Sequence, residues 1–474
     1  MSLDLPSSDH RAGSSSEDDV SRMRQFLIPM WRDLGGAAEV AGSVSITGSG
    51  DLPSVFAVSD FATASIGVAG AAIAELLGAR FGDVPRVSVN RRLSSLWYAW
   101  SIRPDGWSLP APWDPIAGDY RTSDGWIRLH TNAPHHRDAA LSVLDVPANK
   151  DQVAQAVARW SADALESAVI GSGGCAAAMR STLAWKQHPQ GQSVSAEPLV
   201  MACATDDTDD DAWSPNPARP LQGLRVLDLT RVLAGPVATR FLAGFGADVL
   251  RIDPPTWDEP AVVPEVTLGK RCARLDLRDA SARAHFHQLL RRAHVLVHGY
   301  RADALENLGF DASARRAIRP GLIDVSLNAY GWSGPWRNRR GFDSLVQMSA
   351  GIADAGMRVL GKDRPTPLPV QALDHATGYL MAAAVIRGVT QRLSSRRGFE
   401  ARASLARTAD LLISGPPGRV AASLDSGTDS DYFGEVEATA FGPAHRLRAP
   451  VQIGQASMQW DRPAAKLGSS SAQW

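Results

Sequence analysis

The sequence has few cysteines, almost no net charge and no long apolar run. Three cysteines occur among 474 residues, and their odd number and spacing favour reduced thiols over a disulfide framework or a metal site. Lysine and arginine total 49 against 50 acidic residues, which excludes the positive field typical of nucleic-acid-binding proteins. The longest uncharged apolar stretch, residues 61–74, is shorter than the roughly 20 residues of a bilayer span. We therefore expect a cytoplasmic protein with neither membrane nor nucleic acid as a partner.

Composition divides the chain into five segments. Residues 1–20 are polar and acidic and lack the apolar core of a signal peptide, which predicts a disordered leader. Residues 205–218 combine aspartates with two prolines and are typical of an acidic linker. This linker separates residues 21–204 from residues 219–413. Residues 414–474 are rich in glycine, proline and serine and predict an irregular wrapping segment.

Residues 219–413 alternate between short apolar runs and amphipathic stretches. Strands are expected at 224–229, 248–252, 273–277, 295–298 and 322–327, and helices at 237–245 and 281–292. Pro236 suits the first turn of a helix and Gly246 its end. Repeated strand–helix–strand units are typical of α/β proteins. We therefore expect a doubly wound parallel sheet in a Rossmann-like large domain.

An internal repeat links the two parts of the chain. Asp60 begins the tetrapeptide DFAT and Asp374 the tetrapeptide DHAT, 314 positions later (374 minus 60). Both follow a short extended run and lead into an apolar helix with an arginine near its end. At the same offset, the alternating residues 87–89 correspond to 401–403. The matched helix and strand indicate a common origin.

Several motifs follow one another between residues 220 and 413. They are PLQGLRVLDLTRVLAGP at 220–236, GADVLRID at 246–253, GKRCARLDL at 269–277, VLVHGY at 295–300, ALENLG at 304–309, YGWSGP at 330–335 and GFD at 341–343. Their order resembles the family III CoA-transferases, a family that includes formyl-CoA transferase, carnitine CoA-transferase and alpha-methylacyl-CoA racemase. The resemblance marks residues 219–413 as a CoA-binding Rossmann-like domain that carries the nucleophile helix.

Residues 21–204 resemble the later portion of the same family. They hold the aspartate helix at Asp60, a small-domain segment at 120–129 and a further match at 175–200. The chain thus looks like the back half of one unit fused ahead of the front half of another, with a smaller α+β domain in the first part. Family members are interlocked dimers, so the resemblance implies a homodimer, or a pseudo-dimer within one chain.

The resemblance implies that Asp374 is the catalytic nucleophile. A carboxylate that attacks an acyl-CoA preserves the thioester energy as an anhydride, so CoA moves to an acceptor acid without ATP. Acyl-CoA and a carboxylic acid are then the substrates, with no covalently bound cofactor and no metal. From the pattern alone, an aspartate before a helix is more often an N-cap. Asp60 is the competing candidate, as a structural cap or as a second nucleophile.

Residues that bind CoA are implied by the same resemblance. The loop after the first strand corresponds to the contact with the nucleotide and pantetheine, and four further positions match residues near the adenine and its phosphates. Basic side chains at loop ends suit a phosphate-rich ligand. The implied residues are Arg231, Val232, Leu233, Ala234, Leu275, Arg278, Tyr300 and Arg340.

Three alternative functions have their own sequence signals. A racemase-like isomerase needs a histidine before the aspartate of the Gly-x-Asp motif, and Phe342 stands there. A decayed CoA-binding subunit is suggested by Gly299, where formyl-CoA transferase has asparagine, and by Asn307 at a position expected to be basic. A nicotinamide dehydrogenase is disfavoured because the loop at 231–236 lacks the Gly-x-Gly-x-x-Gly fingerprint.

Overall fold

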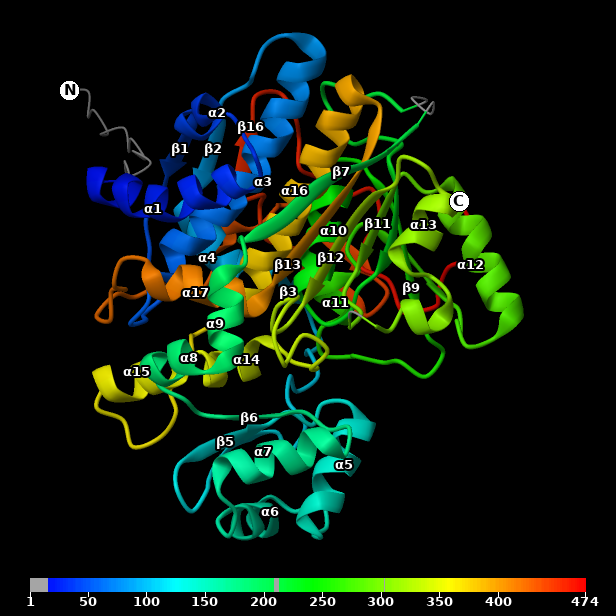
Figure 1. The fold of residues 1–474 in the computed structure, drawn as a ribbon. Coiled ribbons are helices and arrows are strands. Elements are labelled where there is room, and N and C mark those ends of the chain that lie inside the picture. Colours follow the sequence, from blue (N-terminus) through cyan, green and yellow to red (C-terminus); the bar gives the residue numbers. More distant parts are fainter. Residues whose placement is uncertain (1–15, 209–212, 302) are drawn as a thin grey trace, which may run out of the picture.

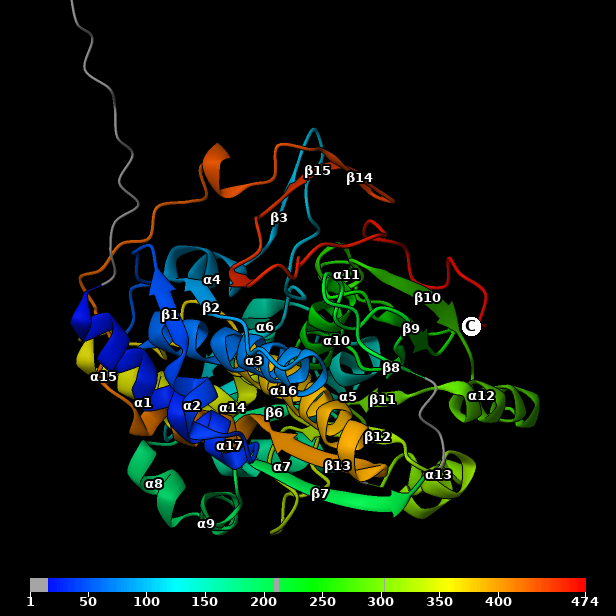
Figure 2. The same ribbon diagram turned by 90° about the horizontal axis from the view of Figure 1, so that it is seen from above.

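A seven-stranded sheet forms the centre of the molecule (Figures 1 and 2). The computed structural model describes residues 16–208, 213–301 and 303–474. In spatial order the strands are β10 (Lys270–Arg274), β9 (Asp248–Asp253), β8 (Arg225–Leu229), β11 (Val295–His298), β12 (Ile323–Asn328), β13 (Arg397–Ser404) and β7 (Val200–Asp207). The first six are parallel and follow the doubly wound Rossmann order, whereas β7 is antiparallel. The expected α/β fold is confirmed, although β10 begins three residues before the expected strand at 273–277.

Helices cover both faces of this sheet, which is why its strands are apolar on both sides. Val226 and Val295 face a core shared with α10 (Ala234–Gly244) and α16 (Ala372–Ser395). Leu227 and Leu296 face the opposite core, shared with α12 (Ala280–Arg292). Between these elements lie α11 (Val263–Val266), η1 (Glu306–Leu308) and α13 (Ala312–Ile318).

Two long helices, α3 (Val58–Phe81) and α16, pack side by side at the heart of the molecule (Figures 1 and 2). Helix α3 is long and apolar enough to cross a membrane, but 89% of its most apolar window is buried inside the protein. Its composition is therefore that of a core helix.

The internal repeat extends well beyond the matched tetrapeptides. Helix α3 leads to β2 (Val87–Asn90) and α4 (Arg91–Trp97), while α16 leads to β13 and α17 (Leu405–Ser414). Asn90 caps α4 and Ser404 caps α17, again 314 positions apart (404 minus 90). Strand β2 lies between parallel β1 (Val44–Thr47) and antiparallel β16 (Val451–Ile453), as β13 lies between parallel β12 and antiparallel β7.

A smaller α+β domain projects from the large one (Figure 1). Its elements are the antiparallel strands β4 (Gly118–Arg121), β5 (Trp126–Leu129) and β6 (Ala176–Ala178) and the helices α5 (Pro134–Leu144), α6 (Lys150–Val157) and α7 (Ala162–Gly171). It packs against α14 (Asp343–Ser349) through an apolar cluster around Leu345 and Met348. Three further helices surround this junction: α8 (Thr182–Gln187), α9 (Pro189–Ala196) and α15 (Ile352–Val359).

The boundaries expected from composition differ from those observed. Residues 1–15 lie outside the described residues, but the last part of the expected leader begins α1 (Glu17–Asp33), because Ser16 and Asp19 form a capping box. The expected linker begins within β7, and residues 209–212 lie outside the described residues. The C-terminal segment is not wholly irregular, because β15 (Gly442–Arg446) pairs with β3 (Ile102–Pro104) and β16 with β2. The remaining elements are α2 (Ala38–Gly42), η2 (Asp429–Asp431) and β14 (Glu437–Thr439).

Candidate functional site

The site lies where the strand order reverses, between the carboxyl ends of β8 and β11. Ligands of open α/β sheets bind at this point. The loop after β8 carries Arg231, and the residues after β11 include Tyr300. Arg231 Nη2 donates a hydrogen bond of 2.9 Å to the Tyr300 hydroxyl. The Arg231 guanidinium also lies 5.1 Å from the Tyr300 ring centre and 4.8 Å from that of Trp257. Two predicted residues thus meet, together with Trp257, which no motif in the sequence marks.

The loop after β8 has a strained backbone at Val232. Its φ is 65°, a left-handed conformation that is costly for a β-branched residue. The carboxylate of Glu259 holds this conformation by accepting hydrogen bonds of 2.9 Å from the Val232 N–H and from the Trp257 indole. Glu259 is itself paired with the buried Arg251. Such strain, over-determined by its surroundings, is characteristic of ligand-binding loops.

A buried ion pair supports the loop from beneath. Lys270 Nζ donates to the Asp228 carboxylate at 3.1 Å and to the Thr239 hydroxyl at 2.6 Å, and Asp228 also accepts from the Thr230 N–H at 2.9 Å. Burial alone would raise the pKa of Asp228, but the charges of Lys270 and Arg251 outweigh it and lower that pKa. The first residues of the loop are therefore anchored to the sheet.

Asp374 lies in the first turn of α16 and does not cap it, because Gln371 occupies the N-cap position. The N-cap interpretation is therefore wrong. Asp374 is 8% exposed, and its backbone N–H donates a 2.9 Å hydrogen bond to Asp343 Oδ2 of α14. Within the described part of the chain, neither carboxylate forms an ion pair with a basic side chain.

The two carboxyl groups titrate unusually because they are buried side by side. Burial, and then the charge of Asp343, raise the pKa of Asp374 well above its usual range. Burial raises the pKa of Asp343 to about 6, although hydrogen bonds from Gln347 and from the Asp374 N–H oppose the shift. Two carboxyls with separated pKa values form a recognised signature of a functional site.

Gly378 lets α16 approach the loop predicted to bind CoA. A Cβ on Gly378 would lie 2.4 Å from the Ala234 carbonyl oxygen, so only glycine permits this contact. Asp374 precedes Gly378 by four residues and therefore lies on the same helix face, roughly one turn or 5–6 Å away. The structure thus places Asp374 about one helical turn from the residue that contacts Ala234, at the end of the predicted CoA loop.

The small domain lies against the opposite side of Asp343. The ring of Phe342 stacks on His130 with centres 3.7 Å apart. Arg340 Nη1 donates to the Gly173 carbonyl at 3.1 Å, and Arg339 pairs with Glu166 at 2.9 Å. Burial lowers the pKa of His130 to about 3, so its ring is neutral. Both parts of the chain therefore surround the Asp343–Asp374 pair.

Asp60 has entirely different surroundings. It is 1% exposed and pairs with Arg91 at 2.7 Å and with Arg22 at 3.1 Å. Arg91 also pairs with Asp51, which in turn pairs with Arg419 of the C-terminal segment at 2.8 Å. Asp60 is the third residue of α3, and Ala57 is the N-cap. Its carboxylate is therefore neutralised in an ion-pair network rather than used as a cap.

Two predicted CoA residues make no described contact with the Arg231 loop. The Arg278 side chain is 72% exposed and pairs with its neighbour Asp276 at 2.6 Å. Leu275 packs against the α12 side of the sheet. These residues follow β10, two strands away from the switch point, so the structure does not bring them to Asp374.

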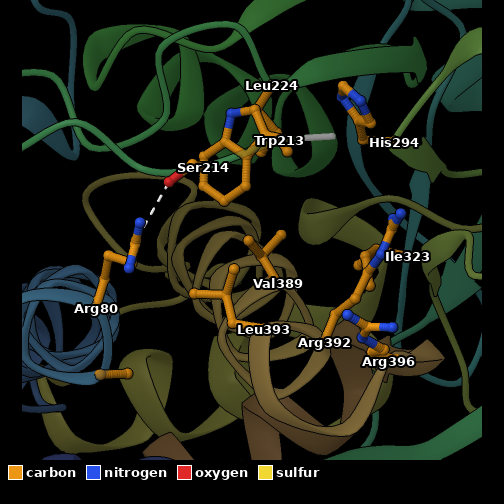
Figure 3. A pocket seen from close by; sticks show the side chains of 11 residues that line it. Arg80, Trp213, Ser214, Leu224, His294, Ile323, Val389, Arg392, Leu393 and Arg396 are labelled. Atoms are coloured by element: carbon orange, nitrogen blue, oxygen red, sulfur yellow. Dashed lines mark hydrogen bonds between the residues drawn. The ribbon is translucent and has the colours of Figure 1, made fainter. Parts of the chain in front are cut away.

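A separate cavity of about 330 Å³ lies at the other edge of the sheet (Figure 3). Leu224 and His294, which precede β8 and β11, line it together with Arg80 of α3 and Arg392 of α16. Figure 3 shows Arg80 directed at Ser214, which accepts its 3.3 Å hydrogen bond. None of the residues predicted to act on CoA lines this cavity.

Comparison with known proteins identifies the segment that carries this site. Residues 221–426 match the family model of CoA-transferase family III. The chain is 30% identical over 249 residues to acetyl-coenzyme A transferase nodX of Hypoxylon pulicicidum, covering 50% of this chain and 41% of that protein. It is 32% identical over 191 residues to probable fatty acyl-CoA transferase Rv3272 of Mycobacterium tuberculosis, covering 37% and 48%.

Other relatives show similar coverage. Succinyl-CoA:glutarate CoA-transferase of Mus musculus is 28% identical over 249 residues, which cover 49% of this chain and 54% of that protein. The crystal structure of Rv3272 in its orthorhombic form aligns with a TM-score of 0.38 at 32% identity, over 41% of this chain and 55% of that one. The chain spans about half the length of the curated relatives it matches. By these matches, residues 221–426 are similar to CoA-transferase family III.

Proposed function

We propose that this protein is a CoA-transferase that moves CoA from an acyl-CoA to a carboxylic acid through Asp374. The observation that carries the proposal is a buried carboxyl beside Asp343 that has no basic partner among the described residues. It lies on the helix that contacts the loop at the topological switch point. The curated relatives named above, all described as CoA-transferases, support it.

The proposed reaction begins with attack of the Asp374 carboxylate on the thioester carbonyl of the donor. The C–S bond breaks, which gives a mixed anhydride and CoA thiolate. The thiolate then attacks the aspartyl carbonyl, releases the donor acid and leaves an aspartyl-CoA thioester. An acceptor carboxylate repeats these steps in reverse and regenerates Asp374. The position of Asp374 in the first turn of α16 favours its ionised form and opposes the effect of burial.

Both parts of the chain are proposed to form one pseudo-dimeric unit. The small domain, from residues before 205, packs against the segment that holds Asp343. Asp60 is proposed to be structural, since Arg22 and Arg91 neutralise it. We place the activity in the cytoplasm, consistent with three unpaired cysteines.

Trapping of the covalent intermediate tests the proposed function. The full chain is incubated with acyl-CoA donors and hydroxylamine, and peptides are mapped by mass spectrometry. We expect a hydroxamate at Asp374 and loss of activity only when donor is present. An inactivated enzyme modified at another aspartate, or labelled carboxylate exchange at the native rate in the Asp374→Ala variant, would refute the assignment.

One observation favours an isomerase as the second candidate. The neutral His130 ring stacks on Phe342, where racemase relatives of the resembled family carry their histidine. An imidazole from the small domain thus lies beside the Asp343–Asp374 pair. Deuterium incorporation at the α-carbon of an acyl-CoA, without an acceptor acid, would support isomerisation, and its absence in wild-type protein would exclude it.

A further inference from the structure

The cavity at the amino ends of the central strands has no role in the proposed reaction. Its volume is about 330 Å³, at the lower end of the range found for small-molecule sites. Leu393 lines it and lies on α16 19 residues after Asp374 (393 minus 374), which is roughly 28 Å along the helix. The cavity is therefore separate from the proposed catalytic site.

The walls of this cavity come from both parts of the chain. Arg80 lies next to the last residue of α3, and Arg392 lies in the last turn of α16, so the repeated helices present their C-terminal turns to one space. Trp213 and Ser214, which follow β7 in the segment that joins the two parts, line it as well (Figure 3). A molecule bound here would contact both parts and their connection.

The formally charged side chains that line the cavity are basic. They are Arg80, Arg392 and Arg396, and no aspartate or glutamate is among the described lining residues. In Figure 3, Arg80 lies on one side of Val389 and Leu393, whereas Arg392 and Arg396 lie on the other. Guanidinium groups on both sides of a concave space give it a positive potential, which attracts an anion.

Arg80 has hydrogen-bond donors available for such an anion. Its Nε donates the 3.3 Å hydrogen bond to the Ser214 hydroxyl, which carries no charge. Across residues 16–208, 213–301 and 303–474, Arg80 forms neither an ion pair nor a further side-chain hydrogen bond. A guanidinium has five N–H donors in a planar fork that matches a carboxylate. The two Nη groups of Arg80 therefore remain for a ligand.

The floor of the cavity is apolar. Leu224 precedes β8, Ile323 begins β12 and Val389 lies on α16, and these side chains are only 1%, 0% and 4% exposed. The partly buried Trp213 packs against the same core. A purely inorganic anion would leave this apolar surface in contact with water, whereas an apolar group on the ligand would cover it. The lining therefore suits a molecule that is both apolar and anionic.

We propose that this cavity is a second ligand site, which takes a small organic carboxylate with an apolar body. The Nη groups of Arg80 bind the carboxylate, Arg392 and Arg396 contribute to the positive potential, and the apolar body rests on the floor around Val389. This site is independent of the proposed function. Because the cavity exists only when α3, α16 and the connecting segment are packed together, binding stabilises the folded chain.

Isothermal titration calorimetry of the full chain, without CoA, tests this site with hexanoate as the probe. Arg80→Gln removes the charge at the cavity and is expected to weaken hexanoate binding about tenfold, the loss from one charge-assisted pair. Arg86→Gln, at an exposed arginine that does not line the cavity, is the matched control and should bind as wild type does. Hexanamide lacks the charge and inorganic phosphate lacks the apolar body, so both should bind more weakly than hexanoate.

A second variant and a second readout separate lost charge from lost space. Leu393 is 37% exposed, so Leu393→Trp can be accommodated while its larger ring fills part of the cavity. It should weaken hexanoate binding although all three arginines remain. Hexanoate should also raise the unfolding temperature of wild type and of Arg86→Gln more than that of Arg80→Gln or Leu393→Trp.

Three results would overturn the inference. Equal hexanoate affinity in Arg80→Gln and wild type would place the ligand elsewhere, for example at the proposed catalytic site. Hexanamide or phosphate binding as tightly as hexanoate would mean that charge and apolar surface do not act together. Absence of hexanoate binding to wild type would mean that there is no such site. In each case, CoA exchange by wild type would leave the proposed function intact.

Discussion

The two aspartate helices share a frame but differ in electrostatics. Helices α3 and α16 each have 24 residues, and each carries its aspartate at the third position. Their N-cap residues, Ala57 and Gln371, have ψ values of 60° and 65°. The backbone was therefore retained in both copies, while the surroundings of the carboxylates diverged.

The difference lies in what faces each carboxylate. Asp60 meets two arginines and is part of a network that fastens α1 and the C-terminal segment to α3. Asp374 meets a second carboxyl, and Gly378, one turn later on the same helix, meets the loop predicted to bind CoA. A paired buried carboxylate serves stability, whereas an unpaired one is costly to keep ionised and is retained where chemistry requires it.

The largest expected effect is a difference in CoA exchange activity between variants of the two aspartates. Asp374→Asn removes the proposed nucleophile and is expected to lower CoA exchange by about 10⁴-fold or more, as loss of a covalent nucleophile does in other enzymes. Asp60→Asn should keep exchange within a few-fold of wild type, because Asp60 lies in the ion-pair network. Steady-state exchange of labelled carboxylate measures both. The opposite ranking would show that α3 carries the active aspartate.

Stability should rank the two sites the other way, with the larger loss on the Asp60 side. Arg91→Met leaves Asp60 and Asp51 without their fully buried partner and should cost about 3–5 kcal/mol of unfolding free energy. Asp374→Asn should be neutral or stabilising, because it removes repulsion from Asp343. Urea denaturation followed by circular dichroism measures both. A loss below about 1 kcal/mol for Arg91→Met would mean that the network is not structural.

A glycine distinguishes the helices at equivalent positions, Ala64 and Gly378 (378 minus 64 is 314). Gly378→Ala would force a methyl group against the Ala234 carbonyl and Val237, costing about 1–3 kcal/mol through overpacking. It should also displace the CoA loop and weaken CoA binding. Ala64→Gly, the matched control, should lose only about 1 kcal/mol from helix propensity and leave CoA binding unchanged. Equal CoA affinities in the two variants would argue against contact between α16 and the loop.

The parallel sheet and the repeat could be predicted because both rest on local patterns. Apolar runs bounded by glycine marked the central strands, and identical offsets marked the repeated helix and strand. The role of Asp60 could not be predicted, since its partners Arg22 and Arg91 are separated from it by 38 and 31 residues. The N-caps could not be predicted either, because an aspartate at the third helical position and one at the N-cap look alike in sequence.

The missed site residues share one property: their partners are distant in sequence. Asp343 was seen only as part of a motif, and its contact with Asp374 depends on the packing of α14 against α16. Trp257 and Glu259 lie in a loop without a regular pattern. Arg278 was carried over from the resemblance, but β10 ends at Arg274, so it falls on an exposed turn beside Asp276.

The Asp343–Asp374 pair should make stability depend on pH. The pKa of Asp343 is about 6 in the folded protein against an ordinary 3.8, so its contribution to stability is full below about pH 4 and is lost as pH rises through 6. At roughly 1.4 kcal/mol per pKa unit, the loss is about 3 kcal/mol. Asp343→Asn should remove this part of the decline, leave the part due to the buried Asp374, and shift the rise of exchange activity to lower pH. Urea denaturation between pH 4 and 8 tests it, and identical pH dependence in both proteins would contradict the coupling.

The smallest effect concerns the backbone strain at Val232, in the loop that α16 contacts. Val232→Gly allows the left-handed φ without steric cost and should gain about 1 kcal/mol from relief of strain, partly offset by the entropy of glycine in the unfolded chain. CoA affinity should nevertheless fall, because a freer loop must be ordered on binding. Thermal unfolding and calorimetric titration of one preparation measure both changes. A variant that is less stable than wild type but binds CoA as tightly would contradict this prediction. It would show that the hydrogen bond to Glu259, and not the strain at Val232, fixes the conformation of the loop.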